Sequence, residues 1–190
     1  SGTVRDALIR HGHEAMSRDL IPTEAPGPHY TGDVFDVIND GWDLAIFHPP
    51  CTYLASSGLH WNHRVPGREE KTEESVRFVR ALYDSPIPRV AVENPIGALS
   101  TRFRRPDQII QPWQFGHDAS KATCLWLRGL PLLVPTDVLP GGKAARRGNQ
   151  TPSGQNKLGP SPDRWKLRSI TYPGIAEAIA AQWGALPPLP

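Results

Sequence analysis

The sequence has very few cysteines and no long apolar run. Only two cysteines, Cys51 and Cys124, occur in 190 residues, which argues against a disulfide framework and predicts a reducing compartment. No segment approaches the roughly 18–20 apolar residues of a membrane span, and no signal peptide is visible at the start. The histidines and the two distant cysteines lack the spacing of metal ligands. We therefore expect a cytoplasmic protein without a bound metal or a membrane partner.

The charge is small overall but unevenly distributed. A net charge of +2, with 38% hydrophobic and 21% charged residues, is ordinary for a globular domain. Residues 141–168 contain seven Lys and Arg against one Asp, a net charge of +6, so the remaining residues sum to −4. Such a segment fits a polyanionic partner whose phosphates it neutralises. A solvated surface loop is the alternative.

A short apolar run predicts a buried strand that ends beside a cysteine. Residues 44–47 are followed, after one residue, by Pro49 and Pro50, which carry no N–H and stop strand pairing. Cys51 comes next, so its thiol is expected at the carboxyl edge of a sheet, where open α/β folds bind ligands. A small buried apolar cysteine at a strand end is the alternative.

A second segment repeats this arrangement. Residues 89–95, Arg-Val-Ala-Val-Glu-Asn-Pro, again combine an apolar strand, a polar pair and a proline. Between the two strands, residues 74–83 have the periodicity of an amphipathic helix. Alternating strands and helices predict an α/β domain with a parallel sheet. Cys51 and Glu93 would then lie at the same sheet edge, as one active site.

These segments resemble a known family. Pro49-Pro50-Cys51 and Glu93-Asn94-Pro95 are similar to the Pro-Cys and Glu-Asn-Val signatures of the DNA cytosine-5 methyltransferases, in the same order and with a similar separation. Residues 121–131 resemble a segment of compact, phage-type proteins of this superfamily. The resemblance covers most of the chain loosely and a smaller part specifically. It implies a DNA-modifying enzyme with a Rossmann-like fold, a mostly parallel sheet and bound S-adenosylmethionine.

The resemblance places the cofactor site near the start of the chain. Thr3 is expected to cap a helix that forms the second half of a strand–turn–helix–strand unit, whose first strand the sequence does not contain. In the family, a glycine turn approaches the methionine part of the cofactor, and an acidic residue after the second strand binds the ribose hydroxyls. Gly2 and Asp19 match those positions. Asp33 matches the residue that accepts from the adenine amino group, and Pro49 is expected to line the same pocket.

The resemblance also assigns roles at the two strand ends. Carbon 5 of a pyrimidine is not nucleophilic enough to attack a sulfonium methyl group unaided, but addition of a thiolate at carbon 6 makes the ring an enamine. Cys51 is the expected nucleophile. Glu93 is expected to meet the charge on the ring through N3 and the exocyclic amine, more effectively if burial raises its pKa. Asn94 is expected to position these groups.

Five residues are expected to contact the substrate. Ser56 belongs to a small, polar and aromatic segment that suits a loop closing over a flat base. Lys121 and Thr123 stand on a predicted strand where the family has a Gln-x-Arg-x-Arg pattern, which is a departure from it. Arg146 and Arg147 come from the basic segment, where they would meet phosphates.

We expect three regions in the chain. Residues 1–139 would form the α/β core that binds S-adenosylmethionine, and residues 140–168 a basic Gly- and Pro-rich loop or lid. Residues 169–190 would complete the core with a helix and a Pro-rich tail. No region is long enough for a sizeable target-recognition domain, although a base inside a duplex must be flipped and its backbone held. Single-stranded DNA, low sequence specificity or an accessory protein are therefore open alternatives.

The expected function is methyl transfer from S-adenosylmethionine to carbon 5 of cytosine in single- or double-stranded DNA. One alternative is a pyrimidine-nucleotide methyltransferase that acts on dCMP, or a transferase of a modified group from an altered cofactor. A third is a nucleic-acid-binding relic that keeps the sheet but has lost the chemistry. The sequence leaves the target sequence and the oligomeric state open.

Overall fold

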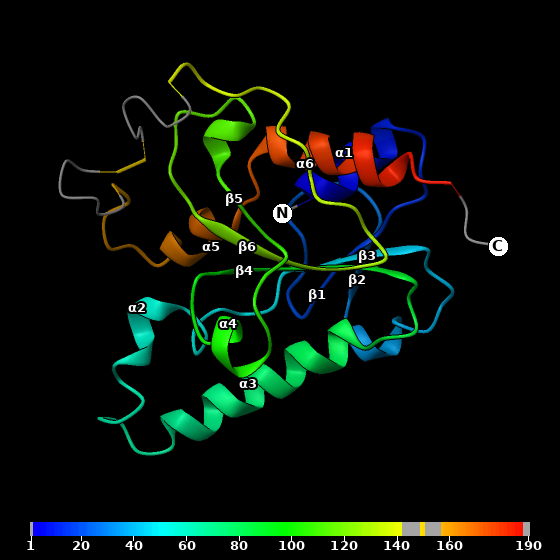
Figure 1. Cartoon of the computed structure of the whole chain (residues 1–190). Helices are drawn as coiled ribbons and strands as arrows, with labels where there is room; N and C mark the ends of the chain where they lie inside the picture. The colour runs from blue at the N-terminus through cyan, green and yellow to red at the C-terminus, as the bar shows by residue number, and fades with distance from the viewer. Residues whose placement is uncertain (1, 142–148, 151–156, 188–190) are drawn as a thin grey trace. The chain divides into compact units, whose positions relative to one another are not determined.

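The computed structural model describes residues 2–141, 149–150 and 157–187 (Figure 1). The chain forms two compact units whose sequence ranges interleave. The first unit comprises the described residues of Ser1–Val37, Gln111–Ser120 and Leu133–Pro187. The second comprises those of Ile38–Ile110 and Lys121–Leu132. Within the predicted basic loop, residues 140–168, the structure describes residues 140–141, 149–150 and 157–168, and the last of these include most of a short helix, α5 (Arg164–Ser169).

The second unit contains a four-stranded mixed sheet with the strand order β3-β4-β6-β5. Its elements in chain order are β3 (Leu44–Phe47), α2 (Ser56–Leu59), α3 (Arg68–Tyr83), β4 (Arg89–Pro95), α4 (Leu99–Arg102), β5 (Gln108–Ile110) and β6 (Thr123–Arg128). β3 and β4 are parallel, as the helix between them predicted. β6 runs antiparallel to both of its neighbours. The protein is therefore mixed α/β, but two of the three strand pairings in this sheet are antiparallel, so the expectation of a mostly parallel sheet is not confirmed here.

The core of the second unit lies around its two central strands. The side chains of Val90 and Val92 on β4, and of Cys124 and Trp126 on β6, are wholly buried. Burial of each such side chain contributes about 1.5–3 kcal/mol. The indole Nε1 of Trp126 donates to the carbonyl oxygen of Arg104 at 2.8 Å, so the large ring is buried without losing its hydrogen bond.

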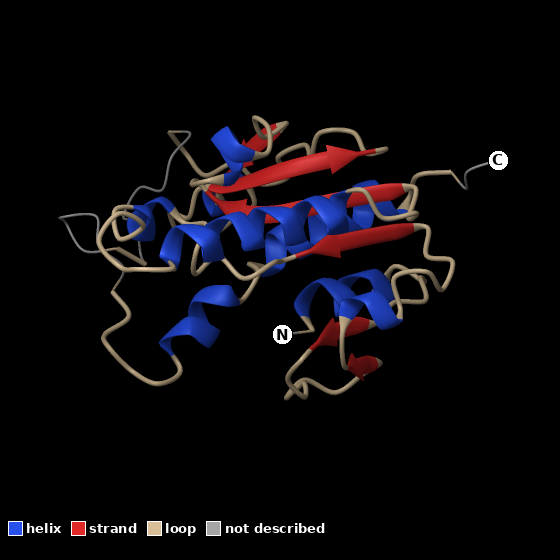
Figure 2. Ribbon diagram, turned by 90° about the horizontal axis from the view of Figure 1, so that it is seen from below, coloured by secondary structure: helices blue, strands red, loops and turns tan. Residues whose placement is uncertain are grey.

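α3 covers one face of this sheet (Figure 2). Val76, Val79 and Leu82 form its buried side, as the periodicity predicted. The helix begins at Arg68, six residues before the predicted start, after Gly67 in the left-handed conformation. The first turns contain Arg, Glu and Lys, so no apolar periodicity marks them in the sequence.

The first unit pairs two short parallel strands, β1 (Ser17–Asp19) and β2 (His29–Thr31). Its helices are α1 (Thr3–Arg10), α5 (Arg164–Ser169) and α6 (Pro173–Ile179), with short 3-10 turns at Val34–Asp36 and Pro112–Gln114 and a π-helical turn at Ala180–Gly184. α1 packs against α6 and the π-helical turn through small apolar side chains (Figure 1). These are Ala7, Ala176 and Ala180, with Val4 and Leu8 around them.

A buried arginine holds the start of the first unit together. The Arg5 guanidinium on α1 donates to Oγ of Ser17 at 3.1 Å, to the carbonyl oxygen of Pro28 at 3.3 Å and to that of Pro26. A Cβ on Gly2 would lie 2.2 Å from Nη2 of Arg5. Gly2 is the N-cap residue, so the prediction that Thr3 caps this helix was wrong.

None of the helices within the described part of the chain is both long enough and apolar enough to span a membrane.

Candidate active site

The two predicted strand ends meet in the second unit. Phe47 on β3 is the register partner of Val92 on β4. The next residues along each strand, His48 and Glu93, contact each other directly, with 2.8 Å between Nδ1 and Oε2. Because the strands are parallel, their carboxyl ends lie at one edge of the sheet, where ligands bind in open α/β folds.

A buried amide fixes the proline turn that precedes Cys51. The side chain of Asn94 donates from Nδ2 to the carbonyl oxygen of Pro49 at 2.9 Å. Asn94 is only 2% exposed, and its Oδ1 has no hydrogen-bond partner among the described residues. A buried acceptor left unpaired in this way costs about 1–3 kcal/mol. Asn94 thus holds the proline turn through its amide.

The two cysteines occupy contrasting environments. Cys51 is exposed, and its carbonyl oxygen accepts from the backbone N–H groups of Leu54 at 3.0 Å and Ala55 at 2.9 Å, which form a tight turn. Cys124 is wholly buried on β6, and burial raises the pKa of its thiol. A buried thiol with a raised pKa is inert. The thiol available for chemistry is therefore that of Cys51, and the alternative of a buried apolar residue applies to Cys124 instead.

The pKa of Glu93 is lowered by its neighbours in this structure. Burial by itself would raise the pKa of its carboxyl, whose side chain is 18% exposed. The positive charge of His48, the hydrogen bond with it and the charge of Lys121 outweigh burial, and they hold the pKa below its ordinary value. The condition for more effective donation, a pKa raised by burial, is therefore not met in the free protein, because His48 lies beside the carboxyl.

The predicted substrate residues lie in different surroundings. Lys121 is half-buried just before β6 and acts electrostatically on Glu93. Thr123 is buried in β6, and its hydroxyl donates to the carbonyl oxygen of Lys121 at 3.2 Å. Ser56 is exposed at the first turn of α2. Arg146 and Arg147 lie outside the described residues.

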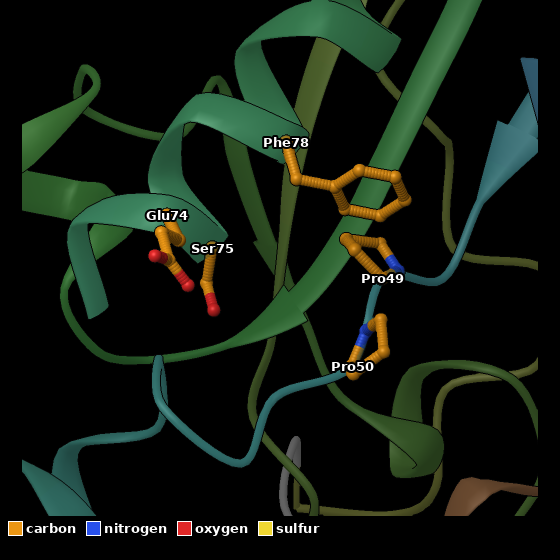
Figure 3. Close-up of a pocket in the computed structure, with 5 residues that line it drawn as sticks. All are labelled: Pro49, Pro50, Glu74, Ser75 and Phe78. Atoms are coloured by element: carbon orange, nitrogen blue, oxygen red, sulfur yellow. The ribbon is translucent and has the colours of Figure 1, made fainter. Parts of the chain in front are cut away.

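A shallow hollow lies between the proline turn and α3. It encloses about 230 Å³ and is lined by Pro49, Pro50, Glu74, Ser75 and Phe78. Figure 3 shows the Phe78 ring above the Pro49 ring, with Glu74 and Ser75 on the preceding turn of α3. Phe78 on α3 and the proline turn before Cys51 therefore face the same hollow.

Of the four predicted cofactor residues, Gly2, Asp19 and Asp33 belong to the first unit, and Pro49 belongs to the second. Asp19 is the last residue of β1, and its Oδ1 accepts from the N–H of Ile21 at 3.2 Å. Asp33 follows β2 and caps the next turn, since Oδ1 accepts from the N–H of Phe35 at 3.0 Å. Two exposed carboxylates therefore follow neighbouring parallel strands. The close approach of Arg5 to Gly2 is a packing reason for that glycine, independent of any ligand.

Large apolar side chains beside these carboxylates are exposed. Leu20 is 71% exposed, Ile21 50% and Phe35 43%. Exposed apolar groups next to polar ones mark a ligand surface more often than isolated ones do. Ionised carboxylates accept hydrogen bonds, so Asp19 and Asp33 could each hold a hydroxyl or amine group of a cofactor.

Sequence reasoning overlooked His48 and the three exposed apolar residues. The signal for His48 was its place between the apolar strand and Pro49. If the parallel pairing continues by one residue, this position lies opposite Glu93. The signal for Leu20, Ile21 and Phe35 was their position directly after the strands that end near Asp19 and Asp33. Over the described residues, no three His, Cys, Asp or Glu side chains group as metal ligands.

No family model matches this sequence, and comparison with curated proteins and with solved structures gave no significant match.

Proposed function

We propose that this chain is an S-adenosylmethionine-dependent methyltransferase with a Rossmann-like fold that acts on carbon 5 of cytosine in DNA. The observation that carries the proposal is the hydrogen bond from Asn94 to the carbonyl oxygen of Pro49. It ties the turn bearing the accessible Cys51 thiol to the end of β4, one residue from Glu93. A nucleophile and a ring-activating carboxyl are thereby supported on two adjacent strands.

Each group has a defined task in this chemistry. The Cys51 thiolate adds to carbon 6 of the ring, and the electrons move toward N3. Glu93 meets that charge at N3 and the exocyclic amine, and carbon 5 becomes nucleophilic. S-adenosylmethionine, which Asp19 and Asp33 would hold, would supply an electrophilic methyl group for carbon 5. Water would take the proton from carbon 5, and the electrons of that C–H bond would expel the Cys51 thiolate and restore the ring.

The cofactor site proposed for the first unit is supported by its chemistry. Asp19 would accept from the ribose hydroxyls, and Asp33 from the adenine amine, while Leu20 and Phe35 would contact the ring. Phe35→Ser and Asp19→Asn should each weaken S-adenosylmethionine binding about tenfold, roughly 1.4 kcal/mol. Isothermal titration would measure this, with the exposed Glu14→Gln as the control that should leave affinity unchanged. Equal affinity in all variants would show that S-adenosylmethionine does not bind at this site.

A trapping experiment tests the covalent step. Fluorine at carbon 5 cannot leave as a proton does, so a cytosine carrying it should hold the protein as a stable adduct after methyl transfer. We expect an oligonucleotide with 5-fluorocytosine to give a denaturation-resistant complex that contains Cys51 in a digested peptide. Cys51→Ala should abolish the complex and methyl transfer. Cys124→Ala, at the buried thiol, should retain both in the fraction that folds.

The substrate is identified by the same assay with a tritiated methyl group on the cofactor. Label on duplex or single-stranded DNA supports the proposal, and the ratio between them shows whether a base is flipped without a partner. Label on dCMP alone would move the activity to nucleotide metabolism. Cofactor binding without label on any of them would contradict methyl transfer by this chain.

A further inference from the structure

A contact between a histidine and a carboxylate joins two adjacent strand ends at the candidate active site. His48 Nδ1 lies 2.8 Å from Glu93 Oε2. The His48 side chain is 41% exposed and that of Glu93 is 18% exposed, so solvent reaches the imidazole more readily than the carboxyl. The contact follows directly from the parallel register, which ends at Phe47 and Val92.

The charge state of this pair poses a chemical problem for the proposed reaction. Among the described residues, the charged groups that act on Glu93 are His48 and Lys121, and both favour the ionised carboxylate. An ionised carboxylate only accepts hydrogen bonds. The ring nitrogen N3 of cytosine is also an acceptor, so Glu93 must gain a proton before it can stabilise charge developing there.

We propose that His48 is a positioning residue that holds the proton for Glu93 and delivers it when a cytosine occupies the site. This inference rests on the proposed function. The N–H bond at Nδ1 of the imidazolium breaks, and an O–H bond forms at Oε2 of the carboxylate. Imidazole and carboxyl both become neutral, and Glu93 donates to N3. No electron transfer occurs, and after the product leaves the proton returns from Oε2 of Glu93 to Nδ1 of His48, which restores the ion pair.

Burial of Glu93 by the bound base determines the direction of the proton transfer. A bound base would displace water from Glu93, and loss of water disfavours charged groups relative to neutral ones. An ion pair in the open site therefore becomes a neutral pair in the covered one. Lys121 stays as the cation that balances charge as it moves into the ring.

The first test measures Glu93 without requiring activity. Selective ¹³C labelling of glutamate side chains allows the Glu93 carboxyl to be titrated by NMR. His48→Asn removes the favourable charge but leaves burial, so we expect the pKa of Glu93 to rise relative to wild type. His60→Asn, at an exposed histidine on the loop after Cys51, should leave it unchanged. An unchanged titration in His48→Asn would overturn the proposal.

The second test is the pH profile of methyl transfer. An imidazole–carboxyl pair keeps one proton to higher pH than a lone carboxyl, since the ordinary pKa values are about 6.5 and 4.3. In His48→Asn, kcat should therefore begin to fall on the alkaline side at a pH that is lower by at least about one unit. Activity should recover on acidification. A uniform loss of kcat at every pH would show a merely structural role and would overturn the proposal.

The two tests separate the inference from the function on which it rests. If wild type transfers no methyl group to any substrate at any pH, the proposed function fails and the delivery step fails with it. A raised pKa in His48→Asn would then still establish the coupling of the pair. If wild type is active but the alkaline fall in kcat occurs at the same pH in His48→Asn, only the proposed proton delivery is wrong.

Discussion

Glu93 shows how one neighbouring side chain reverses the effect of burial. Its carboxyl lies at the end of β4, mostly shielded from water, and this environment alone favours the neutral acid. His48 and Lys121 favour the charged form and prevail. A depressed pKa means that ionised Glu93 stabilises the folded state. This stability is present above the ordinary pKa and is lost as the pH falls through the lower pKa of the folded state.

We predict that Glu93→Gln changes the acid stability of the protein. Above about pH 5, wild type should be more stable to urea than the variant, because only wild type has the ion pair with His48. The difference should shrink as the pH falls below about 4.3, where the carboxyl of the unfolded chain is already protonated. Glu74→Gln, at an exposed carboxylate of α3, should follow wild type at every pH. A difference independent of pH would contradict the linkage.

At the scale of elements, the loop after Cys51 is fixed by its contact with the loop after β4. Ala55 and Gly97 form an isolated antiparallel bridge. The N–H of Ser56 donates to the carbonyl oxygen of Ile96 at 3.0 Å, and that of Ala98 to Leu54 at 2.8 Å. The position of the nucleophile thus depends on backbone contacts as well as on Asn94.

Gly97→Ala should break this contact. The added Cβ would lie 1.8 Å from the carbonyl oxygen of Leu54, a backbone atom that cannot rotate away. We expect a loss of about 2–3 kcal/mol in the free energy of unfolding and slower trapping of 5-fluorocytosine. Gly58→Ala is a matched control, since its Cβ would meet chiefly the flexible end of Arg68. Equal stability of the two variants would show that the loops are not held together.

The start of the first unit depends on Arg5 in a similar way. Arg5→Met should cost about 3 kcal/mol in the free energy of unfolding, because the carbonyl oxygen of Pro26 would lose its donor and that of Pro28 would keep only Ser17 as donor. Arg10→Met changes an exposed arginine on the same helix and should stay within about 0.5 kcal/mol of wild type. Urea denaturation of both variants would measure this. A small effect of Arg5→Met would mean that water replaces the guanidinium.

At the scale of the whole molecule, the uneven charge bears on the partner. Residues 141–168 carry a net charge of +6 on a chain whose total is +2. If DNA is the substrate, this segment is the part of the sequence best suited to neutralise phosphates, and binding should weaken steeply with salt.

The salt dependence of binding tests this expectation. Removing Arg146 and Arg147 together by substitution with Gln should reduce the slope of log K against log salt on single-stranded DNA by about 1.4, or about 0.7 per phosphate contact. Fluorescence anisotropy of a labelled oligonucleotide at several salt concentrations measures it. Exchanging Arg77 and Arg80 on α3 for Gln gives a variant of equal charge. A slope equally reduced in both variants would mean that net charge, rather than the segment, attracts DNA.

The sequence by itself determined the local elements that carry the candidate site. Apolar runs at residues 44–47 and 89–95 and the periodicity of residues 74–83 specify strand, strand and helix because these patterns reflect burial along the chain. The prolines after residues 44–47 end the first strand, so Cys51 lies directly after the strand end. The parallel pair β3–β4 could be predicted too, since a helix connects its strands.

Only the tertiary structure decided which side chains face one another. The reversed direction of β6, the contact between His48 and Glu93, and the lowered pKa that results all depend on register and on neighbours distant in sequence. The same holds for the bond from Asn94 to Pro49, and for Arg5, which the sequence presents as one more charged residue on a helix. The periodicity of a sequence shows which positions are buried. The hydrogen-bond partner of a buried polar group, however, comes from a segment distant in the sequence, and only the packing of the two segments determines it.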